Sequence, residues 1–175
     1  MFERNVRSDD AAGSLTAAGA VLRLRFDSRA RLTYKGPGVV SGGVISRFEA
    51  EVEVSDFDVM NLILTHLAFR QVFVYDKYRT TFRCEGCEVT LDEFRHTASS
   101  SRSKVNAARL KRAASELALS TARPVPHSYA GAFERVRRNM NLPFTDATFE
   151  AFSGISLSER IGEWLTESEE GNAAQ

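Results

Sequence analysis

The sequence predicts an α+β protein: an antiparallel β-sheet curled into a complete or incomplete barrel, with helices packed outside it and a C-terminal helical segment. Three observations support this class. Short segments alternate polar and apolar residues, their polar faces carry charges of mostly one sign, and amphipathic helical segments could cover the apolar faces. A sheet that turns such charged rows inward, towards a lumen, accommodates all three.

Length and composition limit the alternatives. The chain has 175 residues, of which 43% are hydrophobic and 26% charged, so one folded unit is expected rather than a disordered chain. The expected boundary separates a barrel domain with covering helices (1–140) from a C-terminal extension (141–175). A net charge of zero argues against general nucleic-acid binding. The sequence contains neither a long apolar span nor a signal-peptide core, so no membrane association and a cytoplasmic location are expected.

The net charge of zero conceals strong segregation. Residues 21–36 contain five basic residues and one acid, whereas residues 44–58 contain five acids and one base. Residues 70–83 contain four bases and one acid, and residues 85–93 contain four acids and no base. The sign of the charge therefore changes from each short segment to the next.

Alternation and periodicity place the expected elements along the chain. Ser55 and Asp58 resemble a capping box that begins a helix ending near residue 68. Residues 1–20 are expected to be polar and turn-rich, and RHTASSSRSK (95–104) to be a loop or linker. Strands are expected at 21–26, 30–35, 44–54, 71–84 and 88–93, and further helices at 104–119, 128–140 and 155–165.

Rows of like charge facing a lumen suggest a ligand. Lysine and arginine bind phosphate oxygens, arginine as a two-pronged fork. Rows of carboxylates bind hard divalent cations such as Mg²⁺ or Mn²⁺. The pattern thus favours a polyphosphate site with metal, the machinery of phosphoryl or nucleotidyl transfer. The alternative is a solvated ladder of cross-strand salt bridges without a ligand.

The motifs themselves resemble those of a known family. LTYKGP at residues 32–37, followed by RxExExE at residues 47–53, is similar to the CYTH superfamily, the triphosphate tunnel metalloenzymes. The resemblance runs from Phe2 to Glu93 and resumes to about residue 155. Its nearest branch looks like bacterial class IV adenylate cyclases and thiamine triphosphatase-like proteins.

The resemblance implies an antiparallel barrel whose tunnel holds a triphosphate-containing small molecule (inorganic, thiamine or nucleoside triphosphate) with Mg²⁺ or Mn²⁺. It assigns no catalytic residue with certainty. It implies phosphate-binding roles for Arg23, Arg25, Lys35, Arg47, Lys77 and Arg79, and metal-binding roles for Glu49, Glu51, Glu53 and Asp92.

Two departures from the family pattern bear on activity. The family begins with a strand carrying ExExK, whereas this chain begins at FERN, where that strand is expected to have ended already. The family also follows the LDE strand with a strand carrying ExE, but here LDEF leads into RHTASSSRSK. We therefore expect both wall strands, and several acids, to be missing.

Three hypotheses follow from this sequence. The chain is a metal-dependent enzyme that hydrolyses or cyclises a triphosphate, a non-catalytic module that binds polyphosphate or nucleotide, or a truncated product with neither function. The identity of the triphosphate and the oligomeric state stay open. Cys84 and Cys87 are expected to be free thiols at a hairpin tip, since one pair cannot form a four-ligand zinc site.

Overall fold

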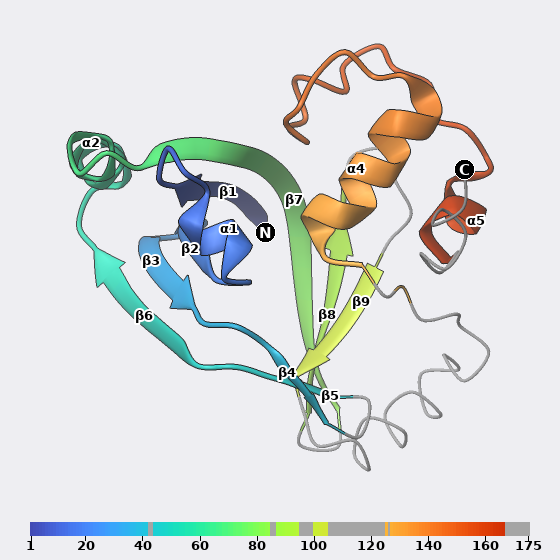
Figure 1. The fold of residues 1–175 in the computed structure, drawn as a ribbon. Helices are drawn as coiled ribbons and strands as arrows, with labels where there is room; N and C mark the ends of the chain where they lie inside the picture. The colour runs from blue at the N-terminus through green and yellow to red at the C-terminus, as the bar shows by residue number, and fades with distance from the viewer. Residues whose placement is uncertain (42–43, 85–86, 95–99, 105–124, 126, 167–175) are drawn as a thin grey trace.

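One curled antiparallel sheet dominates the computed structural model, which describes residues 1–41, 44–84, 87–94, 100–104, 125 and 127–166. Its seven strands follow the order β6-β3-β2-β1-β7-β8-β9 and form a half-barrel, which confirms the predicted class (Figure 1). The strands are β1 (Phe2–Asp9), β2 (Val21–Phe26), β3 (Ala30–Lys35), β6 (Glu49–Val54), β7 (Arg70–Cys84), β8 (Cys87–Glu93) and β9 (Ser100–Lys104), and a separate pair contains β4 (Val39–Ser41) and β5 (Val44–Ser46).

The strand expected to be missing at the N-terminus is present. β1 lies in the middle of the sheet, paired with β2 on one side and β7 on the other. Its side chains reverse the usual pattern, because the polar residues Glu3 and Asn5 are 1% and 0% exposed while Arg4 is exposed. A strand whose buried face is polar has no hydropathy signal, so the prediction was wrong.

The segment after β8 also differs from its prediction. Residues 100–104, expected to lie in a loop or linker, form β9 and pair antiparallel with β8, with Thr90 opposite Arg102. β9 carries the sequence SSRSK, so the strand exists without the ExE acids. The run expected at 44–54 is divided into β5 and β6, while the β7–β8 hairpin places Cys84 opposite Cys87 as predicted.

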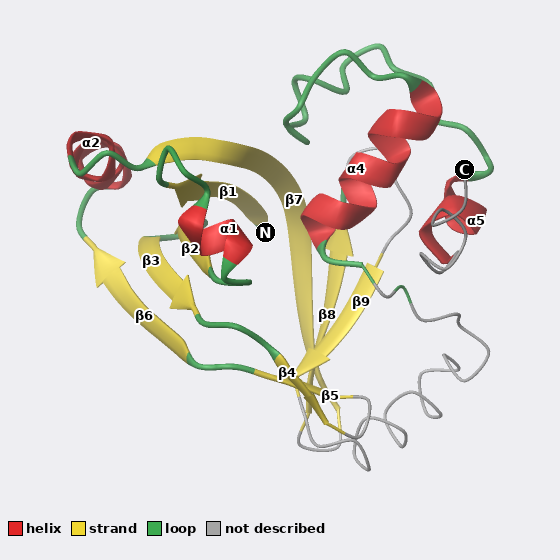
Figure 2. Cartoon of the chain, in the orientation of Figure 1, coloured by secondary structure: helices red, strands yellow, loops and turns green. Residues whose placement is uncertain are grey.

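Four helices are described: α1 (Ser14–Ala17), α2 (Phe57–His66), α4 (Tyr129–Met140) and α5 (Ile161–Thr166). Figure 2 shows α1 beside the central strands β1 and β2, α2 at one side of the half-barrel, and α4 and α5 at the other. The cap of the helix after β6 lies one residue beyond its predicted position, because the side chain of Asp56 accepts the hydrogen bond from the Val59 amide. The helix expected at 104–119 lies almost wholly outside the described residues. No helix in the described part of the chain is long and apolar enough to cross a membrane.

The hydrophobic core joins β7 to the C-terminal helical segment. α4 begins at the Ser128 cap, and Phe133 stacks on Phe73 with ring centroids 5.6 Å apart. Beyond α4, Ala147 forms a parallel bridge with Tyr75, which fixes the segment to the edge of β7 that β8 leaves unpaired. The core therefore anchors α4 beside the concave face of the sheet. Its buried members are Phe73, Tyr75, Phe133, Val136, Leu142, Ala147, Phe152 and Ile161.

Candidate functional site

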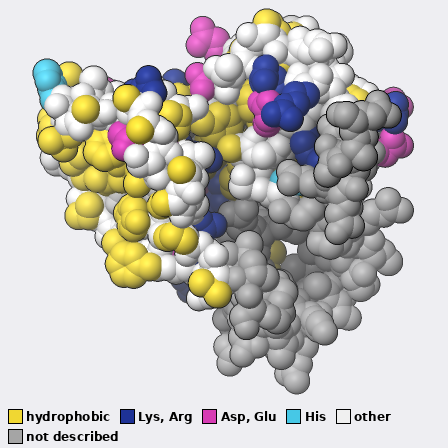
Figure 3. Space-filling view, in the orientation of Figure 1, with side chains coloured by type: hydrophobic (Ala, Val, Ile, Leu, Met, Phe, Trp, Pro, Cys, Tyr) yellow, Lys and Arg dark blue, Asp and Glu magenta, His cyan; other side chains and the backbone are white. Residues whose placement is uncertain are grey.

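The concave face of the sheet encloses a cavity of about 600 Å³, lined by residues of six strands and of the start of α4. Lysine and arginine atoms are visible in this hollow in Figure 3. Strand alternation explains the lining, since Leu24 lies fully buried on the opposite face of β2 from Arg23 and Arg25. The basic lining residues are Arg7, Arg23, Arg25, Arg31, Lys35, Arg47 and Arg79, and the acidic ones are Glu3, Asp27, Glu49, Glu51 and Glu88.

Four of these arginines form what we call the basic wall: Arg7, Arg23, Arg25 and Arg31. Register brings them together, because Arg7 lies opposite Arg23 across β1 and β2, and Arg25 lies opposite Arg31 across β2 and β3. The Nε atom of each is buried and has no hydrogen-bond partner among the described residues. Buried N–H donors are normally satisfied, so this set indicates a place for an acceptor.

Crowding of like charges marks the same wall. Burial, followed by the charge of Arg23, lowers the pKa of Arg25. Burial also lowers the pKa of Arg7, although the charges of Tyr75 and Asp9 oppose this effect. The carboxylates near Arg25 are loosely placed, with Glu51 at 3.5 Å, Asp27 at 3.6 Å and Glu3 at 3.9 Å, although Asp27 also pairs with a terminal nitrogen of Arg31. An oxyanion would therefore relieve both the repulsion and the missing hydrogen bonds.

A second group of charges, the inner cluster, consists of Glu3, Lys77, Arg79, Asp92 and Tyr129. Lys77 is fully buried, with its Nζ 3.2 Å from Glu3 and 3.0 Å from Asp92. Arg79 donates two hydrogen bonds of 2.6 and 2.7 Å to the carboxylate of Asp92, and the hydroxyl of Tyr129 donates a third. The ring of Tyr129 also lies 5.0 Å from Lys77 Nζ. Each charge here already has a partner.

The pKa values in the inner cluster follow from that pairing. Although burial alone would raise it, hydrogen bonds from Arg79 and the charge of Lys77 lower the pKa of Asp92 to about 2. Burial lowers the pKa of Lys77 to about 8, against the raising effect of Glu3 and Asp92. The pKa of Arg79 is raised despite burial, because it donates to Asp92. Asp92 is therefore held as a carboxylate.

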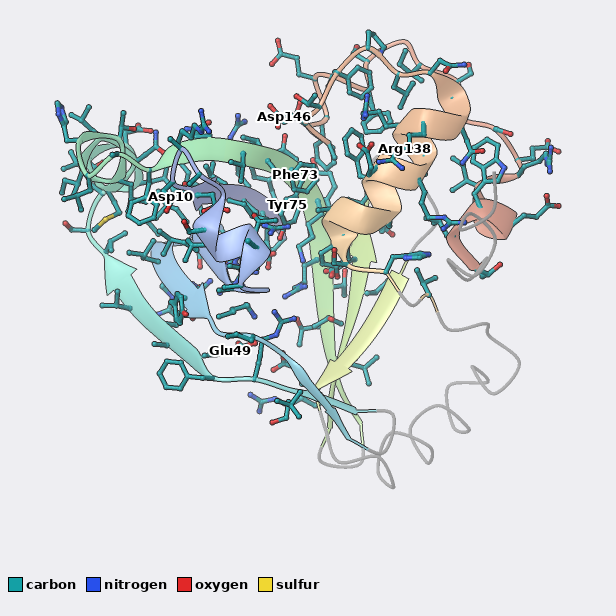
Figure 4. All side chains as sticks on the ribbon, viewed as in Figure 1. Asp10, Glu49, Phe73, Tyr75, Arg138 and Asp146 are labelled. Atoms are coloured by element: carbon teal, nitrogen blue, oxygen red, sulfur yellow. The ribbon has the colours of Figure 1, made fainter. Side chains whose placement is uncertain are left out.

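The acidic row of β6 is paired with cations or hydroxyls of neighbouring strands. Glu49 accepts from Lys35 Nζ at 2.7 Å, and Glu51 accepts from the Thr33 hydroxyl at 2.8 Å. Glu53, whose side chain is 57% exposed, pairs with Arg29 at 2.8 Å. Figure 4 shows Glu49 on one wall of the half-barrel and Tyr75 on the other, beside α4. Cross-strand salt bridges, one of the two alternatives above, thus do form on this side.

The described side chains do not fit a divalent metal. Mg²⁺ needs near-octahedral oxygen ligands, yet nowhere in the described ranges do three or more His, Cys, Asp or Glu residues gather in a metal-binding group. Glu49 and Asp92 lie on β6 and β8, with four strands between them in the sheet. Their predicted metal-binding roles, and those of Glu51 and Glu53, stay predictions.

The cavity receives most of the residues predicted from the sequence. Lys77 is placed in the inner cluster rather than in the lining, and neither Glu53 nor Asp92 lines the cavity. Sequence reasoning missed Glu3 and Arg7 along with their strand, although their spacing with Asn5 is that of ExExK. It also missed Tyr129 and the place of Arg31 in the site. The predicted residues that do line the cavity are Arg23, Arg25, Lys35, Arg47, Glu49, Glu51 and Arg79.

Comparisons with solved structures agree with this architecture. A conserved hypothetical protein from Pyrococcus furiosus aligns with a TM-score of 0.61 and 16% identity, covering 74% of this chain and 82% of its own. A candidate adenylyl cyclase from Hippeastrum with a dominant triphosphatase activity aligns with a TM-score of 0.56 and 21% identity. The alignment covers 79% of this chain and 82% of the Hippeastrum protein. A candidate adenylate cyclase from Vibrio parahaemolyticus aligns with a TM-score of 0.53 and 19% identity, and the alignment covers 69% of each chain. At these identities the likeness shows the fold alone.

Sequence comparison supplies the family. A search of curated protein sequences finds no match for this chain. The CYTH domain, in contrast, matches residues 2–129, which include every strand of the curled sheet and the start of α4. Relatives of this family include triphosphatases and adenylate cyclase-like proteins, and the family is generally metal-dependent. The chain belongs to the CYTH domain family.

Proposed function

We propose that this protein binds a triphosphate in the cavity of its half-barrel and turns it over slowly or not at all. The observation that carries the proposal is the basic wall, whose four buried Nε atoms have no hydrogen-bond partner among the described residues. Guanidinium groups match phosphate oxygens in geometry and charge. Among the described residues, seven basic and five acidic side chains line the cavity, so this lining favours an anion.

The ladder of salt bridges does not account for the whole site. Lys35–Glu49 and Arg29–Glu53 are complete pairs at 2.7 and 2.8 Å, as a ladder requires. In contrast, Arg23 is 4.0 Å from Glu51, and its hydrogen bond to Thr33 is 3.4 Å long. The side chain of Arg23 is only 14% exposed, so bulk water solvates it poorly. A ligand rather than solvent is the partner that this part of the cavity suits.

Slow turnover is expected because the groups that would drive the reaction are absent or engaged. Arg7 occupies the position of the lysine in ExExK, and Asn5 that of the second glutamate. The carboxylates of the inner cluster are held by Lys77 and Arg79. Removal of one preorganised electrostatic partner typically costs about 2.7–4 kcal/mol in the barrier, so several losses leave a rate near background.

Calorimetric titration with tripolyphosphate tests binding. The wild-type chain should bind, and Arg23→Gln should weaken binding by about tenfold, or about 1.4 kcal/mol. Arg160→Gln is the matched control, because Arg160 is exposed and lies outside the cavity lining. Equal affinity of wild type and Arg23→Gln, or no binding at all, would contradict the proposal.

Release of phosphate from tripolyphosphate or ATP, with and without Mg²⁺ or Mn²⁺, tests turnover. Metal-dependent hydrolysis is the second candidate function, favoured by the triphosphatase activity of the similar protein from Hippeastrum. Binding with turnover near background supports the proposal. Robust metal-dependent turnover would show that the engaged carboxylates are released when substrate binds, and the enzymatic function would replace the proposed one.

A further inference from the structure

We infer that the cavity takes its polyphosphate as the metal-free anion, so that Mg²⁺ weakens binding rather than supporting it. This inference rests on the proposed function and specifies the ionic form of the ligand. Two observations carry it independently of each other. One is the chemistry of β1 on the cavity side, and the other is the engagement of the buried carboxylates by cations of this chain.

On β1, Glu3 is the acid that lines the cavity, whereas Asp9 at the end of the strand accepts hydrogen bonds from the amides of Leu15 and Thr16 and does not line it. Asn5 is 0% exposed and lies opposite Arg25 on β2. Neither polar atom of its side-chain amide has a hydrogen-bond partner among the described residues. Arg7 follows on the same face, opposite Arg23. This strand therefore brings one carboxylate and one guanidinium to the cavity, and an amide between them that attracts no cation strongly.

The buried carboxylates cannot bind a divalent ion without displacing a cation of the chain. Glu3 and Asp92, the two acids of the inner cluster, share one fully buried ammonium group, that of Lys77. A metal ion bound to both would lie beside that ammonium, where repulsion between like charges is poorly screened. Displacement of Lys77 would leave it buried without a counter-ion. The inner cluster thus occupies the place where a cation would bind.

Competition then follows from the chemistry of the ligand. Polyphosphate binds Mg²⁺ in solution through the same oxygens that guanidinium groups bind. Chelated Mg²⁺ neutralises part of the charge that attracts the basic wall, and the complex finds few carboxylates free to hold the ion. Magnesium in excess of tripolyphosphate should therefore weaken the apparent affinity by about tenfold, equivalent to about 1.4 kcal/mol.

The direct test is calorimetric titration of the full chain with tripolyphosphate in two buffers of equal ionic strength, one with EDTA and one with excess Mg²⁺. Tighter binding in EDTA supports the inference. Tighter binding in Mg²⁺, or equal binding in both buffers, overturns the inference and leaves the proposed function standing. Absence of binding in both buffers overturns the proposed function itself, so the two failures are distinguishable.

Variants on the two faces of β1 sharpen the test. Arg7→Gln should weaken binding in EDTA by about tenfold, whereas Arg4→Gln, whose exposed side chain lies outside the cavity lining, should not. Asn5→Glu adds a carboxylate beside Glu3, and Asn5→Gln is its uncharged control. Electron paramagnetic resonance of added Mn²⁺ should show more bound metal for Asn5→Glu than for either Asn5→Gln or wild type.

Circular dichroism first establishes which variants fold, and the Arg4 and Arg7 pair remains informative if Asn5→Glu does not. An equal effect of Arg4→Gln and Arg7→Gln in EDTA would overturn the inference. So would stoichiometric binding of Mn²⁺ by the wild-type chain, since it would show that the carboxylates hold a metal as they stand.

Discussion

The basic wall contains only arginines, whereas the inner cluster combines cations with carboxylates, and the two differ in how their buried cations are paired. In the inner cluster, Lys77 and Arg79 lie within 2.6–3.2 Å of carboxylate oxygens. In the basic wall, the arginine Nε atoms are buried and find no hydrogen-bond partner in the part of the chain that the structure describes. A row of charges therefore indicates a binding site where buried donors are left without an acceptor, even if single members such as Arg31 pair with a carboxylate.

The largest effect is expected for the inner cluster. Asp92→Ala removes the carboxylate that faces both Lys77 and Arg79, leaving buried cations with Glu3 alone. Breaking a buried pair in this way should lower the free energy of unfolding by about 3–5 kcal/mol. Urea denaturation measures it, with Glu53→Gln as the control. Because the ion pair of Glu53 with Arg29 is exposed, Glu53→Gln should lower the free energy of unfolding by less than about 1 kcal/mol. Equal losses for Asp92→Ala and Glu53→Gln would contradict the special role of the inner cluster in stability.

Polyphosphate should stabilise the fold through the basic wall. A ligand that binds only the folded state raises the free energy of unfolding by about 2.7 kcal/mol at a hundredfold excess over Kd. Thermal unfolding with tripolyphosphate, compared with chloride of equal ionic strength, measures this gain. No difference between the two salts would favour a ladder of salt bridges without a ligand.

Acid should weaken the inner cluster in a defined range. The pKa of Asp92 is lowered to about 2 from its ordinary 3.8, so the folded state binds its proton less readily than the unfolded state. The ionised Asp92 therefore contributes about 2 kcal/mol to the free energy of unfolding above about pH 4, and this contribution is lost as the pH falls towards 2. Denaturation across this range should show a steeper loss for wild type than for Asp92→Asn. Parallel curves would contradict the assignment.

The smallest effect is expected at the edge of the cavity. Lys35 is already paired with Glu49 at 2.7 Å, so its contribution to an anion is partly offset. Lys35→Ala should weaken tripolyphosphate binding by about 1.5 kcal/mol, the lower end for a charged hydrogen bond. Calorimetry measures the change, and an unchanged affinity would remove Lys35 from the site.

Much of the sheet was predictable, because most strands alternate an apolar face with a charged one. Strands β2, β3 and β6 do so clearly, and the pattern gave both their position and the curl. β1 was not predictable in this way, since its buried face carries Glu3 and Asn5. β9 has the sequence SSRSK, without an apolar residue, and only its pairing with β8 identifies it as a strand.

The sequence predicted which kinds of residue line the cavity, but it did not predict which charges pair with one another. Two-residue spacing predicted that Arg23, Arg25 and Lys35 share polar strand faces, and all three line the cavity, while their binding of phosphate stays a prediction. Spacing could not show that Lys77 is enclosed, because its partners come from β1 and β8, which flank β7 in the sheet. The hydrogen bond from Tyr129 to Asp92 depends on the position of α4, which the core around Phe73 and Phe133 sets. Such contacts become visible only once the strand register is known.

The most direct test of anion binding by the basic wall is nuclear magnetic resonance of the arginine Nε–H groups. Arginine-to-lysine variants assign the signals, and tripolyphosphate is then titrated into the labelled wild-type chain. The account predicts that the signals of the basic wall shift as the anion supplies their missing acceptors. It predicts that the signal of Arg79, bonded to Asp92 at 2.6 Å, stays in place. A shift of Arg79 with no change in the basic wall would contradict the account.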